Sequence, residues 1–453
     1  MSHLKKILSD LSGLKLNCEY WDVRIEDSFE TAIDIMDGEP TACTSSPSLG
    51  AFLRVRKGGF WFFESTTELE NIKSSLEKLS QKEAPVKSQV PYQPKKQEAF
   101  TKISFAEKKF SSVPLADKFT LVKKYSDLVR QNKKVTSTNL RYRDIYKVKS
   151  FLNSVGTQFE FDFNSAGIRF WYTLSENGQI FQDGTSCYGA EFELLKNQDA
   201  KILTALVESE KFLHAPSVTP GKYKVLLDSE VAGVFTHESF GHKSEADFML
   251  GNPEALAEWK LGTKIGADSL TIVDYGGHSG TSGYCPIDDD GTPARKNYLI
   301  KEGVLTGRLH SYETATELDE PPTGNSRAMN FEFEPIVRMT STYIKAGKES
   351  LDSILKRSEG ALLVEGVKHG SGLSTFTIAP TRGYKIGPQG KREPVRLAVI
   401  SGSVFETLKN IEAVSADFHL HSSAVGGCGK MEQWPLPVAD GGPYVLVKEM
   451  QVG

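Results

Sequence analysis

The spacing of apolar residues in the first half of the chain alternates between helical periods and strand-like runs. In residues 4–14 apolar side chains recur at helical spacing, which predicts a short amphipathic helix. Similar stripes predict helices over residues 67–80, 115–130 and 191–213. Runs rich in β-branched and aromatic residues predict strands between them, at residues 18–26, 31–36, 51–56, 59–63, 135–139, 144–151, 158–163 and 168–174. We therefore expect the first half to be an α+β domain.

Glycine, asparagine and proline mark the expected turns. Gly58 and Gly59 predict a hairpin between two early strands, and residues 164–167 and 175–178 predict turns between later ones. Residues 81–98 carry several prolines and lysines and predict a loop. Because no aromatic residues form a stacking platform beside these lysines, the loop is expected to be a solvated surface and not a nucleic-acid site.

The second half has a different pattern, rich in short strands and glycine. Residues 214–221 contain two prolines and a glycine and mark the best domain boundary. A strand is expected over residues 222–227, a helix opens near Val231, and a helix is expected over residues 351–358. The other predicted strands are residues 271–274, 297–301, 304–310, 335–343, 397–407 and 445–452. The prediction is an α+β fold of two domains, an N-terminal strand/helix domain (1–215) and a β-rich C-terminal domain (216–453).

Composition narrows the class of protein. The 453 residues are 39% hydrophobic and 25% charged, with a net charge of -4, which is typical of a globular protein and gives no basic excess for direct nucleic-acid binding. The five cysteines are odd in number and scattered, so a disulfide framework is not expected. Residues 1–10 lack the apolar core of a signal peptide, and no long apolar run predicts a membrane span. These patterns together predict a cytoplasmic location.

Candidate chemistry is concentrated in the helix that opens near Val231. Two histidines and three carboxylates lie within eleven residues: His237, Glu238, His242, Glu245 and Asp247. Neutral imidazoles bind borderline transition metals, and a glutamate beside them is placed to take a proton from an activated water. The pattern therefore favours a metal centre over two unrelated histidines.

The spacing of the two histidines makes a structural demand. Five residues on a regular α-helix turn the chain by about 500°, so the two rings would point about 140° apart. A π-type turn would bring them to one side, and such turns are frequent at functional sites. Gly241 lies between the histidines and lowers the steric cost of this distortion. We therefore predict a π-bulge at residues 237–242.

A third ligand must come from elsewhere, because catalytic zinc usually takes three protein ligands. Cys428 lies among three glycines, which let the backbone approach closely, so it is the preferred candidate. Cys285 is the runner-up. The remaining candidates are His278, His310, His419 and His421.

Residues 232–247 resemble the signature of the TldD/PmbA family, described as modulators of DNA gyrase and as peptide-degrading metalloproteases. Further matching segments follow in the order of that family, at residues 288–293 (DDDGTP), 301–305, 322–327, 335–339, 402–408, 426–430 (GGCGK) and 438–443 (VADGGP). The resemblance covers residues 221–453, whereas residues 1–220 match only in length and in the order of elements.

The resemblance implies a zinc peptidase whose Zn2+ is held by His237, His242 and Cys428. It makes residues 216–453 the metalloprotease domain, with Glu238 as the catalytic acid–base and peptides bound extended in an enclosed cavity. Because the chain keeps the histidine motif, it resembles the catalytic TldD type. The implied partners are a second copy in a homodimer or a paralogous non-catalytic subunit. Glu245 and Asp247 are expected to orient a histidine.

Two other functions fit parts of this pattern. A non-catalytic interaction or regulatory protein of the gyrase-modulator type would need neither the metal nor Glu238. Another metal hydrolase, such as an amidase, would use the same residues on a different substrate. Metal analysis with a chelator-sensitive peptidase assay distinguishes the first alternative from a zinc peptidase, and substrate profiling distinguishes the second.

Overall fold

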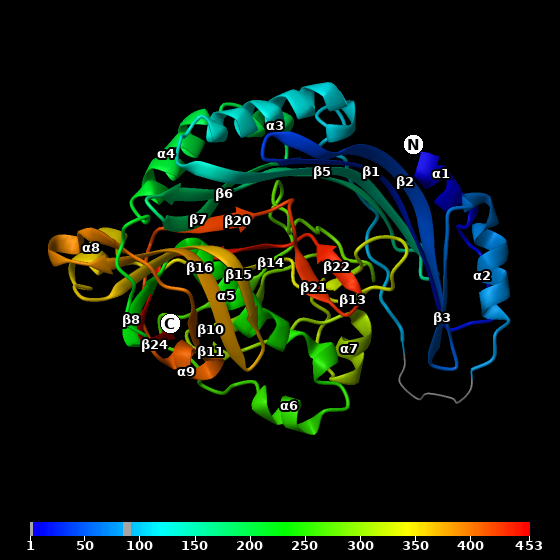
Figure 1. Cartoon of the computed structure of the whole chain (residues 1–453). Coiled ribbons are helices and arrows are strands. Elements are labelled where there is room, and N and C mark those ends of the chain that lie inside the picture. Colours follow the sequence, from blue (N-terminus) through cyan, green and yellow to red (C-terminus); the bar gives the residue numbers. More distant parts are fainter. Residues whose placement is uncertain (1–2, 85–91) are drawn as a thin grey trace.

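The N-terminal half is built on one large curved sheet. The computed structural model describes residues 3–84 and 92–453, and in these residues the sheet has seven strands in the order β3-β2-β1-β5-β6-β4, with β7 paired to β6. Figure 1 shows the long strands arching over the C-terminal half. The bounds are β1 Tyr20–Met36, β2 Glu39–Lys57, β3 Phe60–Thr66, β4 Phe100–Lys102, β5 Val135–Asn153, β6 Gln158–Glu176 and β7 Gln179–Gly189.

Helices cover the outer face of this sheet, and the inner face looks toward the C-terminal half (Figure 1). Val122 and Tyr125 of one helix share a core cluster with Tyr142 and Phe170 of the sheet. Alternation along each strand therefore sends residues of even number on β5 and β6 outward and residues of odd number inward. The helices are α1 His3–Asp10, α2 Ile72–Ser80, α3 Leu115–Arg130 and α4 Asp199–Glu210.

The strands are longer than their sequence pattern predicted. Residues 164–167 were expected to turn, but this prediction is wrong, because β6 continues through them. The Asn164 side chain is buried and donates to the carbonyls of Lys108 and Ala190, so a residue typical of turns is satisfied inside the sheet. Similarly, β1 joins the two strands predicted at residues 18–26 and 31–36, and its hairpin lies at Asp37 and Gly38, both with positive φ.

Two predicted helices are shorter than expected. Residues 191–213 form a 3-10 turn, Phe192–Leu195, followed by α4, and the break falls at Asn197 with a φ of 58°. Residues 67–80 likewise form a 3-10 turn before α2. The predicted hairpin at Gly58 and Gly59 and the helix over residues 115–130 are confirmed. In the predicted loop 81–98, residues 85–91 lie outside the described residues, and the rest contains neither helix nor strand.

The C-terminal half places one helix, α5 Ser229–Thr236, between two sheets. This helix contacts β8, β15 and β16 of one sheet and β14, β20 and β23 of the other. The bounds of the first sheet are β8 Gly221–Leu227, β15 Leu362–Gly372, β16 Thr375–Ile386, β17 Arg392–Val395, β18 Ile400–Ser403, β19 Ile411–Val414 and β24 Val445–Val452. Those of the second are β9 Ile272–Asp274, β10 Asn297–Lys301, β11 Val304–Leu305, β14 Ser341–Ile344, β20 His419–Ser422 and β23 Ala439–Gly442.

Smaller elements complete this half. Two short hairpins are β12 Ser326–Arg327 with β13 Ile336–Val337, and β21 Cys428–Lys430 with β22 Gln433–Leu436. The remaining helices are α6 Pro253–Glu258, α7 Tyr312–Glu317, α8 Leu351–Lys356 and α9 Val404–Lys409. The strand predicted at residues 397–407 is therefore a strand followed by a helix, and those at 304–310 and 335–343 are shorter than predicted. The α+β fold class is confirmed, and within the described residues no helix is long and apolar enough to span a membrane.

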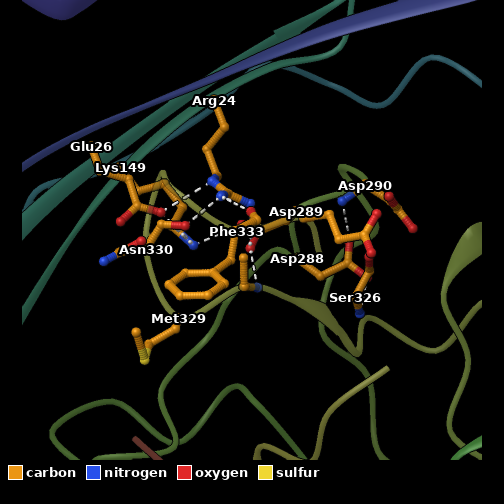
Figure 2. Close-up of polar contacts among 12 residues, drawn as sticks. Arg24, Glu26, Lys149, Asp288, Asp289, Asp290, Ser326, Met329, Asn330 and Phe333 are labelled. Atoms are coloured by element: carbon orange, nitrogen blue, oxygen red, sulfur yellow. Dashed lines mark hydrogen bonds and ion pairs between the residues drawn. The ribbon is translucent and has the colours of Figure 1, made fainter. Parts of the chain in front are cut away.

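A buried polar network joins the N-terminal sheet to the loop after β9. Asp289 pairs with Arg24 at 3.1 Å and with Lys149 at 2.7 Å, and these two cations come from β1 and β5 (Figure 2). Arg24 also donates to the carbonyls of Asn330 and Phe333. Beside this network, Asp290 pairs with Arg54 at 2.7 Å. The two halves are thus joined by ion pairs as well as apolar contacts, and the boundary at residue 215 stays a prediction.

Candidate metal centre

The histidine motif continues directly from α5. Asp228 caps this helix, since its Oδ1 accepts a hydrogen bond of 2.7 Å from the Val231 amide. The chain then widens into a π-helical turn, His237–Gly241, and tightens into a 3-10 turn at His242–Ser244. The predicted π-bulge is therefore confirmed. The two imidazole rings lie with their centroids 5.1 Å apart and both reach one side of the turn.

Close packing explains why glycine occupies position 241. A Cβ added to Gly241 would overlap the Met339 side chain, whose sulfur lies directly against the glycine. Met339 is fully buried and packs with Phe240 in the main core of this half. Position 241 therefore has no room for a larger residue without movement of Met339 or of the π-turn.

Cys428 meets the two histidines from the start of β21. The possible ligand atoms of His237, His242 and Cys428 all lie within 4.8 Å of one another. The Cys428 Sγ lies 3.4 Å from the His242 Nε2. In the described part of the chain, these three residues form the one group of histidines, cysteines and carboxylates close enough to hold a metal ion. The structure therefore brings together all three residues that the resemblance implied.

The other candidate ligands lie elsewhere. The Cys285 Sγ donates to the carbonyl of Ile287 and lines a different cavity. His310 contacts Thr314 and Glu320, and the His421 Nε2 lies 2.8 Å from the Ser229 Oγ. None of these side chains is within reach of His237 and His242 as a ligand.

A carboxylate and a lysine support His242 from behind. The Glu245 Oε2 lies 3.3 Å from the His242 Nδ1, which leaves the Nε2 directed at Cys428. Lys430 approaches Glu245 at 3.1 Å and Asp247 at 2.7 Å. Glu245 therefore has the orienting contact that the sequence suggested, whereas Asp247 contacts Lys430 and no histidine. Although burial would raise the pKa of Glu245, the contacts with His242 and Lys430 lower it.

The three possible ligands shift the pKa values of one another. Burial alone would raise the pKa of the Cys428 thiol, but the two histidines hold it well below its ordinary value. Burial opposes the charge on His242, yet its contacts with Cys428 and Glu245 raise its pKa to about 10. The centre is thus disposed to hold a thiolate, which is the form of cysteine that binds metals.

These residues fit a metal ion by their own geometry. In the described part of the structure, the buried Nδ1 of His237 has no hydrogen-bond partner, which is rare for a buried polar atom. One thiolate and two imidazoles form a donor set that zinc accepts, with one position left for water or substrate.

The centre opens into a cavity of about 700 Å³. Glu238 lines this cavity together with His237 and Cys428, and it is half-buried. The opposite wall belongs to the N-terminal sheet, where Arg169 and Trp171 face inward. Sequence reasoning found no catalytic cluster in the first half and missed this contribution, because the alternation along β6 shows its function only once the sheet is placed over the centre.

Sequence reasoning also missed carboxylates beside the centre. Asp228, Glu230 and Asp440 line the same cavity. Burial raises the pKa of Asp228 to about 8 and that of Asp440 to about 7. Two signals were present in the sequence: Asp228 begins the helix as its cap, and Asp440 lies in the glycine-rich segment 438–443.

The centre thus combines two histidines and a cysteine, which are donor types that zinc accepts, with a glutamate in the same cavity. Residues 220–453 match the family model of the PmbA/TldA metallopeptidase C-terminal domain, and residues 21–81 match that of the PmbA/TldA metallopeptidase domain 1. The chain therefore belongs to the PmbA/TldD family of metallopeptidases.

Relatives and solved structures agree with this assignment. The chain is 33% identical over 465 residues to a metalloprotease of Synechocystis sp., covering 100% of this chain and 99% of the relative. It is 30% identical over 347 residues to a zinc metalloprotease TldD homolog of Saccharolobus solfataricus, covering 69% of this chain and 76% of the relative. The crystal structure of TldE from Thermococcus kodakarensis has the same fold, with a TM-score of 0.80 at 16% identity and 100% coverage of both chains. A candidate modulator of a DNA gyrase from Thermotoga maritima also has a TM-score of 0.80, at 18% identity and 99% coverage of both chains.

Proposed function

We propose that this protein is a zinc-dependent peptidase that hydrolyses peptides or unfolded polypeptide segments. His237, His242 and Cys428 hold the metal, and Glu238 is the catalytic acid–base. The observation that carries the proposal is the convergence of these three ligands within 4.8 Å, in the wall of the cavity that Glu238 also lines. The relatives named metalloprotease and zinc metalloprotease support the same chemistry.

The role of each residue in the proposed reaction follows from the position of its side chain. A zinc ion bound there supplies Lewis acidity that activates water and polarises a carbonyl. Glu238 accepts the proton of the attacking water and delivers it to the leaving amine. Glu245 holds the His242 ring in position, and Lys430 balances the charge of Glu245. The negative charge of Cys428 would moderate the Lewis acidity of a metal ion held there.

The position of the site favours flexible substrates. The cavity of about 700 Å³ has walls from both the N-terminal sheet and the C-terminal half, a recess that suits a short extended segment. A folded protein surface does not fit such a space. We therefore expect cleavage of short or unfolded peptides and resistance of folded proteins.

The test combines metal analysis with peptidase assays on one purified sample. We expect close to one zinc per chain, loss of peptide cleavage with a chelator and recovery when zinc is returned. Glu238→Gln is expected to keep its zinc and to lose at least about a hundredfold in kcat, because its proton transfer is removed. Glu258→Gln serves as the control, since Glu258 contacts Lys243 and does not line the cavity. Full activity of Glu238→Gln excludes Glu238 from the reaction.

A regulatory function of the gyrase-modulator type is the second candidate, motivated by the description of the Thermotoga maritima structure. Such a protein would keep its biological effect in Glu238→Gln and after metal removal. Partners are proposed as a second copy of this chain or a paralogous subunit of the TldE kind. Light scattering of the purified chain, with and without such a subunit, measures self-association and association with the subunit. A cytoplasmic location stays a prediction.

A further inference from the structure

Two arginines lie directly opposite each other on the inner face of the N-terminal sheet. Arg141 of β5 is the register partner of Arg169 of β6, so both side chains leave the same face of neighbouring strands. Like charges in such a cross-strand pair repel. Burial lowers the pKa of Arg169 and the charge of Arg141 lowers it further, while Glu230 acts in the opposite direction. The pair therefore carries an electrostatic cost that a bound anion would relieve.

The other cations on this face already have carboxylate partners. Asp34 binds Arg143 at 2.6 Å, Glu26 binds Lys147 at 2.8 Å, and Asp289 binds Lys149 at 2.7 Å. Among the described residues, Arg141 and Arg169 have no carboxylate within ion-pair distance. The two of them thus differ from every other cation on the inner face of β5 and β6.

Arg169 is held in place without being neutralised. Its guanidinium lies over the Trp171 ring, 4.6 Å from the ring centroid. Its Nη2 donates weakly to the Val367 carbonyl at 3.4 Å. The remaining donors of the planar guanidinium stay available toward the cavity of the metal centre, which Arg169 lines.

The pair lies where two cavities meet. Arg169 lines the cavity of the metal centre, and Arg141 lines a second cavity of about 510 Å³. The two cavities share Trp434 and three residues of the segment 423–426, which precedes Cys428: Ser423, Val425 and Gly426. This segment approaches the sheet at Gly167, where an added Cβ would lie 3.3 Å from the Ala424 amide nitrogen. Arg141 and Arg169 therefore lie on the part of the sheet that the two neighbouring cavities border.

We propose that Arg141 and Arg169 form a carboxylate-binding subsite for the peptide substrate, so that the enzyme prefers peptides with an acidic group at a fixed distance from the cleaved bond. This inference rests on the proposed peptidase function. The group is either an aspartate or glutamate side chain or the C-terminal carboxylate, because a guanidinium binds both in the same bidentate way. A second cavity lined by further basic and aromatic residues gives the rest of the chain room.

The experiment uses the full-length, zinc-loaded protein and ten-residue peptides of alanine and glycine. One glutamate is moved along the peptide, each peptide has a glutamine counterpart, and all are made as free acids and as C-terminal amides. We expect the best acidic peptide to exceed its neutral counterpart by about tenfold to a hundredfold in kcat/KM, the usual effect of one charge-assisted contact. A higher kcat/KM for a glutamate peptide than for its glutamine counterpart identifies a side chain, and a higher kcat/KM for a free acid than for its amide identifies the C-terminus.

Variants assign the preference to the two arginines. Arg141→Gln and Arg169→Gln are each expected to bring the ratio of acidic to neutral kcat/KM close to one. Lys201→Gln is the matched control, because it removes one positive charge from the same cavity wall outside the pair, and it is expected to keep the ratio. Arg169→Glu is expected to reverse the preference toward a lysine-containing peptide. Equal rates for all peptides with the wild-type protein, or an unchanged ratio in both glutamine variants, overturns the inference.

Binding separates this inference from the peptidase proposal. Peptide affinity is measured by fluorescence anisotropy on the Glu238→Gln protein, which does not need turnover. Acid-dependent binding without cleavage by the wild-type protein refutes the peptidase and keeps the subsite. Cleavage without any acid preference refutes the subsite and keeps the peptidase.

Discussion

Cys428 is the residue on which the metal centre most depends. Its hydrogen bond to His242, together with the contact from Glu245, raises the pKa of that histidine, and its Sγ lies 3.4 Å from the His242 Nε2. We predict that Cys428→Ala lowers zinc content at least about tenfold, because two neutral imidazoles alone form an incomplete site. Mass-spectrometric metal analysis measures this, with Cys285→Ala as the control. Zinc content equal to wild type in Cys428→Ala excludes it as a ligand.

Glu245 affects the centre through His242. We predict that Glu245→Gln weakens zinc binding by about ten- to a hundredfold, as removal of a partner behind a metal-binding histidine typically does. Competition with a chromophoric chelator measures the dissociation constant. Asp247→Asn is the comparison, since Asp247 contacts Lys430 and no histidine, and it is expected to have the smaller effect. A wild-type zinc affinity in Glu245→Gln shows that His242 needs no such support.

At the scale of elements, the π-turn between the histidines requires a residue without a side chain at position 241, and this requirement can be tested. We predict that Gly241→Ala lowers zinc affinity at least about tenfold, because the new methyl group collides with Met339 and displaces the turn. The double variant Gly241→Ala with Met339→Ala supplies the missing space and is expected to recover part of the affinity. Zinc affinity equal to wild type in the single variant contradicts this account.

Some elements could be predicted from sequence, and others could not. The π-turn was predictable because two histidines at i and i+5 can share one ion only on a widened helix. The long strand β6 was not, because Asn164 has the character of a turn residue while its partners, Lys108 and Ala190, lie far away in the sequence. The break at Asn197 could not be predicted either, because apolar residues on both sides of it keep a helical spacing.

At the scale of the whole molecule, Asp289 joins the halves. We predict that Asp289→Asn destabilises the protein by up to about 3–5 kcal/mol, because Arg24 and Lys149 stay buried and keep only Glu26 of the two carboxylates that they share. Thermal denaturation at neutral pH measures the loss. Asp352→Asn, which removes an exposed carboxylate paired with Lys356, is the control and is expected to change stability little. A midpoint for Asp289→Asn equal to that of the control contradicts the prediction.

The same ion pairs give a pH dependence with a definite sign. Burial would raise the pKa of Asp289, but Lys149 and Arg24 hold it well below its ordinary value. A carboxyl whose pKa is lower in the folded than in the unfolded state stabilises the fold above its unfolded pKa, about 4, and this stabilisation is lost as pH falls through the lower folded pKa. Wild-type stability is therefore expected to fall more steeply below about pH 4 than that of Asp289→Asn.

The contribution of the first half to the site could not be predicted from one sequence. Residues 1–215 contain no cluster of candidate ligands, yet Arg141, Arg169 and Trp171 reach the two cavities. Which face of β5 and β6 looks inward depends on where α3 and α4 pack, and that is decided by contacts between distant segments. The proposed metal ligands were easier to find, because their chemistry is visible in the residue types.

The separation of the proposed ligands along the chain has a consequence for when the centre can form during synthesis. Cys428 follows His242 by 186 residues, and β14 and β20, which both pack against α5, lie between them in the chain. During synthesis, a nascent chain that already displays both histidines thus still lacks the thiol that would complete the proposed zinc site. On the proposed function, peptide hydrolysis therefore depends on complete folding of the C-terminal half.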